Sequence, residues 1–314
     1  IALPLSIALA LASGVGPEEG IYTAIIAGFL ISFLGGSRVQ IAGPTAAFAT
    51  IVAGIVAKNG MDGLVVATLI AGVLLILMGV FRLGSLIRFI PFTITTGFTA
   101  GIAVTIVIGQ LKDFFGVAYP EGVRPIETME KLAAFLENVG TVNPAALIVG
   151  AVSLAILIIS PYIFKKIPGS LIAVIVGIFM VKFLPLKVST IGNLYTISNA
   201  LPSFHLPTVN FEIVQAAIPN AFTIAILAAI ESLLSCVVAD GMINGKHRSD
   251  MELVAQGAGN IASALFGGIP ATGAIARTAA NIKNGGRTPV AGMVHSITLV
   301  IVLVVLMPYA GMIP

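Results

Sequence analysis

Long apolar segments with almost no charge follow one another through the chain, and they constrain its fold more than any other feature. Residues 221–238, AFTIAILAAIESLLSCVV, carry one charged side chain, Glu231. A run of about 18 or more apolar residues is typical of a membrane-spanning helix. Charged residues make up only 9% of the chain, against roughly a quarter in a soluble domain. The pattern therefore predicts an all-α polytopic membrane protein.

Eleven segments have the composition of spans or half-spans. They are residues 1–14, 19–36, 43–57, 62–81, 89–110, 144–164, 167–184, 213–240, 252–267, 271–283 and 289–307. Two polar stretches interrupt them: residues 112–143, with an amphipathic surface helix expected at 126–138, and residues 185–212, expected to be irregular. The first segment is too short to span and opens on Ile1 rather than Met, so we expect the natural chain to begin earlier.

Several function classes are disfavoured by what the sequence lacks. The net charge of +3 is small and scattered, so no nucleic-acid partner is expected. The single cysteine, Cys236, rules out a disulfide framework and a CxxC motif. There is no P-loop, no HExxH and no metal-ligand spacing, so we predict neither a metal nor a cofactor. An intramembrane enzyme would need a nucleophile–base pair or an aspartate-rich metal motif, and neither is present.

Two segments are too short and too broken to be ordinary spans. Residues 40–60, QIAGPTAAFATIVAGIVAKNG, and 268–286, GIPATGAIARTAANIKNGG, each begin with an extended stretch containing Gly and Pro and then become a half-length helix. Non-helical backbone at membrane depth is tolerated only where it is buried or lines a cavity. Paired interrupted segments are the best sequence indication of a transport site between inverted repeats. The alternative is that Gly and Pro are simply common in membrane helices.

Glu231 is the first candidate functional residue. A charge near the bilayer centre costs about 2.5–3.5 kcal/mol, so such residues normally face a cavity lined by protein. We predict a coupling carboxylate that titrates or binds a cation as substrate moves, with Ser235 on the same helix face. The alternative is a structural carboxylate fixed by a neighbouring helix N-terminus.

Arg277 is the second buried charge, expected about one and a half turns into the second half-helix if that helix opens at 270–272. It could neutralise Glu231 or present positive charge to a substrate anion; the alternative is a side chain that reaches the membrane surface. Half-helix N-termini carry free N–H groups and a positive dipole end, so two of them with an arginine predict an anion site. Asp240 and His247 are expected in a solvated loop.

Five motifs resemble the SulP family of anion transporters, also called the sulfate permease family. They are LPLSIALALASGVGPEEGIYTAIIAGF, GGSRVQIAGPTAAF, RFIPFTITTGFTAGIAV with GQLKDFFG, AIESLLSCVVADG, and GGIPATGAIARTAANIKNGGRTPVAG. The resemblance covers the whole chain. It implies two inverted seven-span repeats arranged as core and gate domains, with residues 1–184 forming the first repeat and residues 185–314 part of the second. Spans twelve to fourteen and a cytoplasmic STAS domain would lie beyond this chain, and the full protein would be a homodimer.

The resemblance also assigns site residues. The family's anion lies between the N-termini of spans three and ten, and span one contributes to the pocket. The residues implied are Gly43, Pro44, Thr45, Ala46, Thr272, Gly273, Ala274 and Ile275, with Leu5 and Leu9 from span one. Glu231 matches the span-eight carboxylate, and Arg277 matches an arginine common in members that bind anions without sodium. Glu231 together with Ile275 disfavours the sodium site of one family branch.

The expected function is secondary active transport of a small anion through the membrane of a bacterium. Sulfate is the leading substrate, with bicarbonate and C4-dicarboxylates open, by proton-coupled symport or by exchange in an elevator movement. The alternatives are a nucleobase–cation symporter of the same fold and an anion channel or exchanger without cation coupling.

Overall fold

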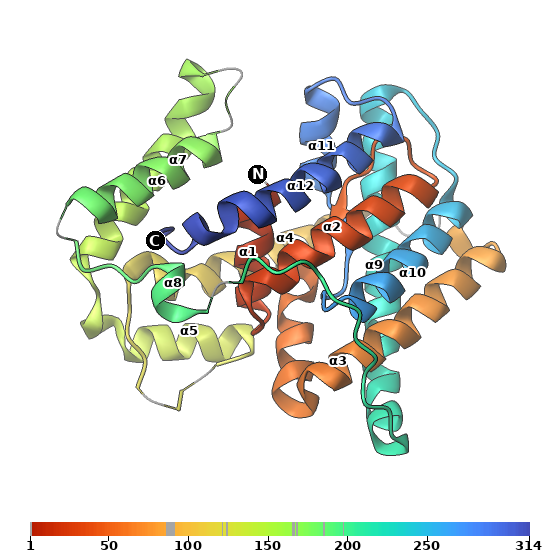
Figure 1. Cartoon of the computed structure of the whole chain (residues 1–314), viewed down its shortest axis with the longest axis horizontal. Coiled ribbons are helices and arrows are strands. Elements are labelled where there is room, and N and C mark those ends of the chain that lie inside the picture. The colour runs from red at the N-terminus through yellow and green to blue at the C-terminus, as the bar shows by residue number, and fades with distance from the viewer. Residues whose placement is uncertain are drawn as a thin grey trace. The chain divides into compact units, whose positions relative to one another are not determined.

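The computed structural model describes residues 2–85, 92–120, 122–123, 125–164, 167, 169–184, 186–196 and 198–314, and the described part is mostly helical (Figure 1). The helices are α1 (Ala2–Ala12), α2 (Pro17–Leu34), η1 (Ala46–Phe48), α3 (Ala49–Val80), α4 (Phe92–Phe115), α5 (Thr128–Glu137), η3 (Val139–Thr141), α6 (Pro144–Ile163), α7 (Gly169–Phe183), α8 (Ile191–Leu194), α9 (Phe211–Ile243), α10 (Ser249–Leu265), α11 (Ile275–Lys283) and α12 (Pro289–Ala310). Two short strands are β1 (Ala42–Gly43) and β2 (Thr272–Gly273).

The all-α membrane fold predicted from the sequence is confirmed. In the part of the chain that the structure describes, five helical segments are long and apolar enough to cross a membrane: α2, the segment Ala46–Val80, α6, α9 and the first part of α12. The predicted spans 43–57 and 62–81 follow one another in α3 across a break at Gly60, whose φ of 68° favours glycine. The start of the predicted span 89–110 lies outside the described residues.

The described chain divides into two compact units. Unit 1 consists of residues 100–198 with residues 306–314, and unit 2 consists of residues 2–99 with residues 199–305. Each unit therefore takes segments from both predicted repeats, so the compact units are not the same divisions as 1–184 and 185–314. The inverted-repeat relation itself stays a prediction.

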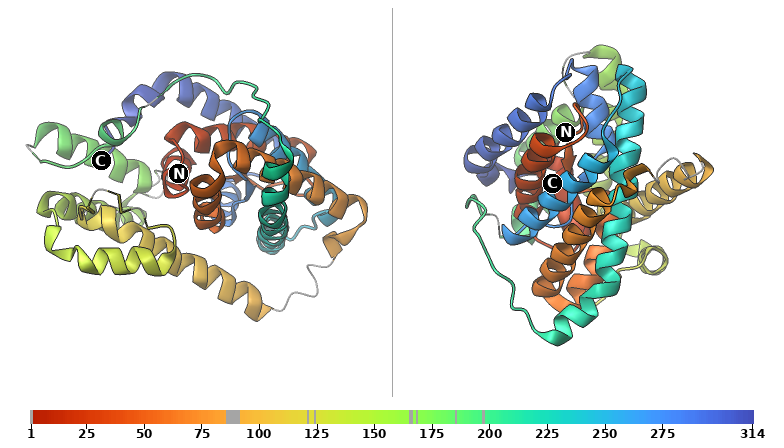
Figure 2. Two further views of the ribbon diagram at one scale, coloured as in Figure 1. Left: turned by 90° about the horizontal axis from the view of Figure 1, so that it is seen from below. Right: turned by 90° about the vertical axis from the view of Figure 1, so that its right-hand side faces the viewer.

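Unit 2 is built around α3, which packs on both α9 and α10 (Figure 2). Apolar side chains from α3, α9 and α10, such as Leu64, Ile224 and Leu253, form its largest buried cluster. The helix α3 crosses α10 at glycines: a Cβ at Gly257 would overlap the Gly72 carbonyl oxygen. Small residues at a crossing let two backbones approach closely, as is common between membrane helices.

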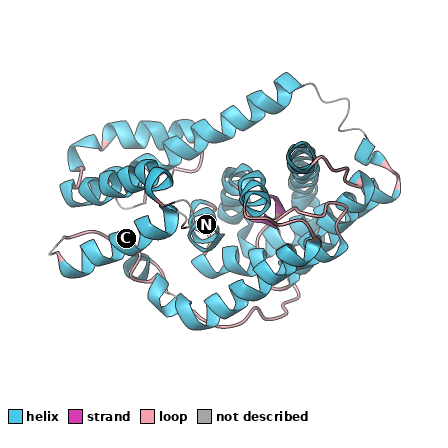
Figure 3. Ribbon diagram, turned by 90° about the horizontal axis from the view of Figure 1, so that it is seen from above, coloured by secondary structure: helices cyan, strands magenta, loops and turns pink. Residues whose placement is uncertain are grey.

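Helices of unit 2 surround the two short strands (Figure 3). Both strands are buried, and α2 and α9 pack against them. Each strand is only two residues long, and a helix begins shortly after it. This places the beginnings of two helices inside the unit rather than at its surface.

Unit 1 contains α5, α6, α7 and α8. The helices α6 and α7 pack on each other. The amphipathic helix predicted at 126–138 is present as α5, begins with a capping box between Glu127 and Glu130, and places Phe135 against Phe115 with ring centroids 5.5 Å apart. The predicted irregular stretch 185–212 contains one short helix, α8.

Candidate functional site

The two broken segments meet at an antiparallel bridge between β1 and β2. Ala42 lies opposite Gly273 and Gly43 opposite Thr272, and the Ala274 N–H donates to the Ile41 carbonyl oxygen at 2.9 Å. A helix begins shortly after each strand, at Ala46 and at Ile275. The first-turn N–H groups of a helix have no partner within that helix. The structure therefore brings together two helix N-termini that are more than 200 residues apart in the sequence.

The second half-helix begins later than the sequence predicted. Residues 271–283 were expected to form the helix, but Thr272 and Gly273 pair with β1 and helical geometry starts at Ile275. A residue whose backbone groups are turned toward a neighbouring strand cannot also open a helix. Arg277 consequently lies in the first turn of α11, and the prediction that it lies one and a half turns in is wrong.

Glu231 connects the two half-helix segments. It lies near the middle of α9, and its Oε2 accepts hydrogen bonds from the Thr45 and Thr272 hydroxyls, each at 2.8 Å. One threonine precedes each helix, so a single carboxylate oxygen holds both segments. The two hydroxyl oxygens are themselves 3.4 Å apart. Glu231 thus lies between the two half-helix segments, and its role in coupling stays a prediction.

Arg277 is buried but only partly satisfied. Its side chain is 4% exposed, and its Nη2 donates to the Ser6 hydroxyl of α1 at 3.1 Å. Its Nε and Nη1 are buried and have no hydrogen-bond partner among the residues that the structure describes. A Cβ at Gly43 would overlap Nη1, so the guanidinium lies directly against β1. A side chain this buried does not reach the membrane surface, so that alternative is excluded.

The predicted option that Arg277 neutralises Glu231 is not observed. Among the described residues, no acidic side chain forms a salt bridge with Arg277. Glu231 is held by threonine hydroxyls, whereas Arg277 extends to α1. The positive charge is therefore left without an acidic partner beside the two helix N-termini.

The remaining predicted residues lie in three places: at the bridge, in α1 and in α9. At the bridge, Gly43 and Gly273 are strand residues, Pro44 and Ala274 follow the strands, and Ala46 and Ile275 are the first residues of η1 and α11. Leu9 is buried in α1 and Leu5 is partly buried one residue before Ser6. Ser235 lies a turn beyond Glu231 and faces Thr278 at 3.5 Å. The serine of α9 that contacts the bridge directly is Ser232, whose hydroxyl accepts the Gly273 N–H at 3.1 Å.

Sequence reasoning missed Ser6 and Thr278. Ser6 is the one polar residue in the apolar stretch ALPLSIALAL, and this position among apolar residues could have indicated a functional role. Thr278 accepts the Ile41 N–H at 3.0 Å and so attaches α11 to the residue that precedes β1. No local pattern distinguishes Thr278 from other helix threonines.

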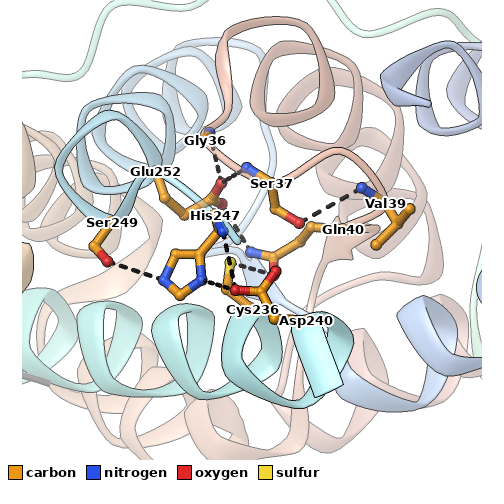
Figure 4. A network of polar contacts seen from close by, with 9 residues as sticks. All are labelled: Gly36, Ser37, Val39, Gln40, Cys236, Asp240, His247, Ser249 and Glu252. Carbon is orange, nitrogen blue, oxygen red and sulfur yellow. Dashed lines mark hydrogen bonds and ion pairs between the residues drawn. The ribbon is translucent and has the colours of Figure 1, made fainter. Parts of the chain in front are cut away.

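A second polar cluster lies at the end of α9, next to the linker that enters β1 (Figure 4). The linker between α2 and β1 consists of residues 35–41. Glu252 accepts hydrogen bonds from three linker residues, Gly36, Ser37 and Gln40. Cys236 donates to Gln40. His247 Nδ1 and the Asp240 carboxylate are 2.7 Å apart. His247 lies in the loop between α9 and α10, as predicted, but its side chain is only 8% exposed and is held by Asp240, which binds both its ring and its backbone N–H. Asp240 itself lies in α9 and not in that loop, so its predicted place is wrong.

The fold and the site have known relatives. A family model described as the sulfate permease family matches residues 1–314. The chain belongs to the sulfate permease family. Among curated members, a putative sulfate transporter of Bacillus subtilis (YvdB) is 44% identical over 100% of this chain and 59% of its own length. The bicarbonate transporter BicA of Picosynechococcus is 35% identical over 96% of this chain and 55% of its own length.

Two solved structures share the fold. The transmembrane domain of a cyanobacterial bicarbonate transporter, BicA, superposes with a TM-score of 0.89 at 31% identity, covering all of this chain and 81% of that one. SLC26A9 superposes with a TM-score of 0.86 at 21% identity, covering all of this chain and 53% of that one. The chain spans somewhat more than half the length of the curated relatives named above. Like its bacterial family members, it is a multi-pass integral membrane protein.

Proposed function

We propose that this chain carries out secondary active transport of a small anion across the inner membrane of a bacterium, with sulfate as the leading substrate. The observation that supports this most is the state of Arg277. A buried charge without a partner is strongly unfavourable, and here two guanidinium nitrogens have no partner beside two helix N-termini. An anion bound there would satisfy both the guanidinium and the first-turn N–H groups.

The charge of the site favours a dianion when Glu231 is protonated. Each helix N-terminus carries roughly half a positive charge, so two of them with Arg277 sum to about +2. An ionised Glu231 would reduce that sum to about +1. Sulfate carries two negative charges, so its binding would favour uptake of a proton by Glu231. This is the physical basis of the proton coupling that we propose.

The substrate is proposed from the relatives as well as from the charge. One named relative is a putative sulfate transporter and another is a bicarbonate transporter. Bicarbonate and C4-dicarboxylates such as succinate therefore belong in any test. The family membership favours an anion over a nucleobase. The polar side chains near the bridge are mostly serine and threonine hydroxyls, with Arg277 and Glu231 as the two charged groups.

The proposed movement is an elevator. All residues of the site, from Ser6 to Arg277, belong to unit 2, so the bound anion could travel with this unit as one body. Proton-coupled symport and exchange would both use this movement. A homodimer of the full protein stays a prediction.

A radiolabelled uptake panel in proteoliposomes tests the proposal. Sulfate, bicarbonate and succinate are offered with and without an imposed proton or sodium gradient. We expect sulfate uptake driven by protons and independent of sodium; absence of uptake for every anion would refute the proposed function.

The same assay tests Arg277. Hydrogen bonds to a charged group are worth about 1.5–3 kcal/mol, which corresponds to roughly a 10- to 100-fold change in affinity. We expect Arg277→Ala to raise the KM for sulfate within that range. The matched control is Lys283→Ala, an exposed cation at the other end of the same helix, which should leave KM unchanged. An unaltered KM in Arg277→Ala would make this arginine structural.

A further inference from the structure

The cluster in Figure 4 is centred on Glu252, a carboxylate that the proposed mechanism does not use. Glu252 is 0% exposed. Its Oε2 accepts the N–H groups of Gly36 at 2.9 Å and Ser37 at 3.1 Å. Its Oε1 accepts the side-chain amides of Gln40 at 2.8 Å and Gln256 at 2.9 Å. Four neutral donors thus fill the carboxylate, three of them from the linker between α2 and β1.

The linker also touches the start of α10 through its backbone. The Arg248 N–H donates to the Gly36 carbonyl oxygen at 3.1 Å, and a Cβ at Gly36 would overlap the Arg248 carbonyl. Glu252 lies one turn further along α10 and accepts the N–H groups of Gly36 and Ser37. The chain is therefore attached to α10 at Gly36 and Ser37, a few residues before β1 begins.

Gln40 carries this attachment to the candidate anion site. Its Nε2 donates to Glu252, and its Oε1 accepts the Cys236 thiol at 3.0 Å, so both ends of the amide are held. Its side chain lies flat against Gly273 of β2: a Cβ at Gly273 would overlap the amide nitrogen and be 2.5 Å from the amide carbon. Gly273 pairs with Ala42 in the bridge that separates the two half-helices.

We propose that Glu252 is a positioning residue for the anion site, acting through Gln40 on Gly273. The carboxylate orients the Gln40 amide, and the amide sets how closely β2 approaches the linker and β1. The distance between the two half-helix N-termini depends on that approach. This inference rests on the proposed function, because it assigns a role toward the same site.

The sign of the effect separates positioning from electrostatics. Glu252→Gln removes a negative charge from a protein that binds an anion, and on charge alone this would tighten substrate binding and lower KM. The variant also places an amide NH₂ opposite N–H donors, because a glutamine has only one acceptor oxygen. Loss of positioning would instead raise KM.

The experiment measures sulfate uptake in proteoliposomes for wild type, Glu252→Gln, Gln40→Met and Gln256→Met. We expect both Glu252→Gln and Gln40→Met to raise KM about tenfold, the effect of one lost hydrogen bond to a charged group, with Vmax per folded molecule within twofold. Gln40→Met keeps the side-chain size but loses the hydrogen bonds to Glu252 and Cys236 that orient the side chain against Gly273, and it replaces Glu252→Gln as the test if that variant does not fold. Gln256→Met is the control, because Gln256 binds the same carboxylate oxygen from within α10 rather than from the linker, and its KM should stay unchanged.

Amide hydrogen exchange gives a second readout that needs no substrate. Faster exchange confined to residues 40–43 and 271–275 in Glu252→Gln and Gln40→Met supports the inference. An unchanged or lowered KM in either folded variant, or unchanged exchange at the bridge, overturns it. If wild type takes up none of the anions, the proposed function fails, and the exchange measurement still decides the role of Glu252.

Discussion

At the scale of single residues, the site pairs a satisfied carboxylate with an unsatisfied guanidinium. Glu231 is held by two threonine hydroxyls, one from each half-helix segment. Arg277 keeps two nitrogens without partners. A side chain already bound to both segments is suited to respond when they change position, whereas a side chain with free donors is suited to bind a ligand. In the proposed mechanism the two buried charges therefore have different roles, Glu231 in coupling and Arg277 in anion binding.

Glu231→Gln should separate coupling from transport. An amide does not titrate, so sulfate uptake should lose its dependence on an imposed pH gradient, while sulfate–sulfate exchange should persist. The variant should fold, because the amide oxygen can still accept the threonine hydroxyls. Uptake driven by a pH gradient and exchange at equal pH are the two measurements. Glu212→Gln, at an exposed position in the first turn of the same helix, is the control; wild-type gradient dependence in Glu231→Gln would contradict a coupling role.

At the scale of elements, the packing of α3 against α10 positions the residues of the candidate site. The helix α3 begins at one half of the site, and α10 carries Glu252. Their glycine contact leaves no space for a side chain. Any change that separates these helices would shift the start of α3 against the linker.

Gly257→Ala should therefore destabilise the protein. The added methyl would overlap the Gly72 carbonyl and come within 2.6 Å of the Ile76 side chain, and overpacking of this kind costs about 1–3 kcal/mol. Thermal unfolding in detergent measures the change. Gly54→Ala, at a position of α3 where a Cβ meets nothing within 4 Å, should be neutral or slightly stabilising. Equal melting temperatures for the two variants would show that the crossing can relax.

The sequence predicted the elements better than their contacts. Uncharged runs located the helices, and the Gly and Pro residues near Pro44 and Pro270 located the two broken segments, because both are local signals. The start of α11 was misplaced because it depends on pairing with β1, far away in the chain. Glu252 was missed for the same reason: in SDMELVAQG it resembles an ordinary first-turn acid, and the linker that buries it lies more than 200 residues earlier.

At the scale of the whole molecule, the complete site belongs to one of two compact units. The proposed substrate-binding residues, Glu231 and the Glu252 cluster are all in unit 2. A movement that separated the segments carrying β1 and β2 would have to break the bridge between them. Movement of the unit as a body keeps that bridge intact.

Spin labels test this directly. Labels at Val80→Cys and Ile301→Cys, both exposed positions of unit 2, should keep their separation when sulfate is added. Labels at Val80→Cys and Ile159→Cys, one in each unit, should change theirs. Cys236 is buried and does not compete for the label. Pulsed electron resonance in liposomes gives both distances, and a changed distance within unit 2 would contradict rigid-body movement.

The bridge between β1 and β2 has a consequence for how selectivity could evolve. In the proposed site, part of the anion receptor consists of peptide groups, which every variant keeps as long as the bridge retains its geometry. Discrimination among oxyanions would then depend mainly on the few side chains beside the bridge, namely Ser6, Thr45, Thr272 and Arg277. Substitution of one hydroxyl-bearing residue there would be the smallest change that could alter which anion is transported.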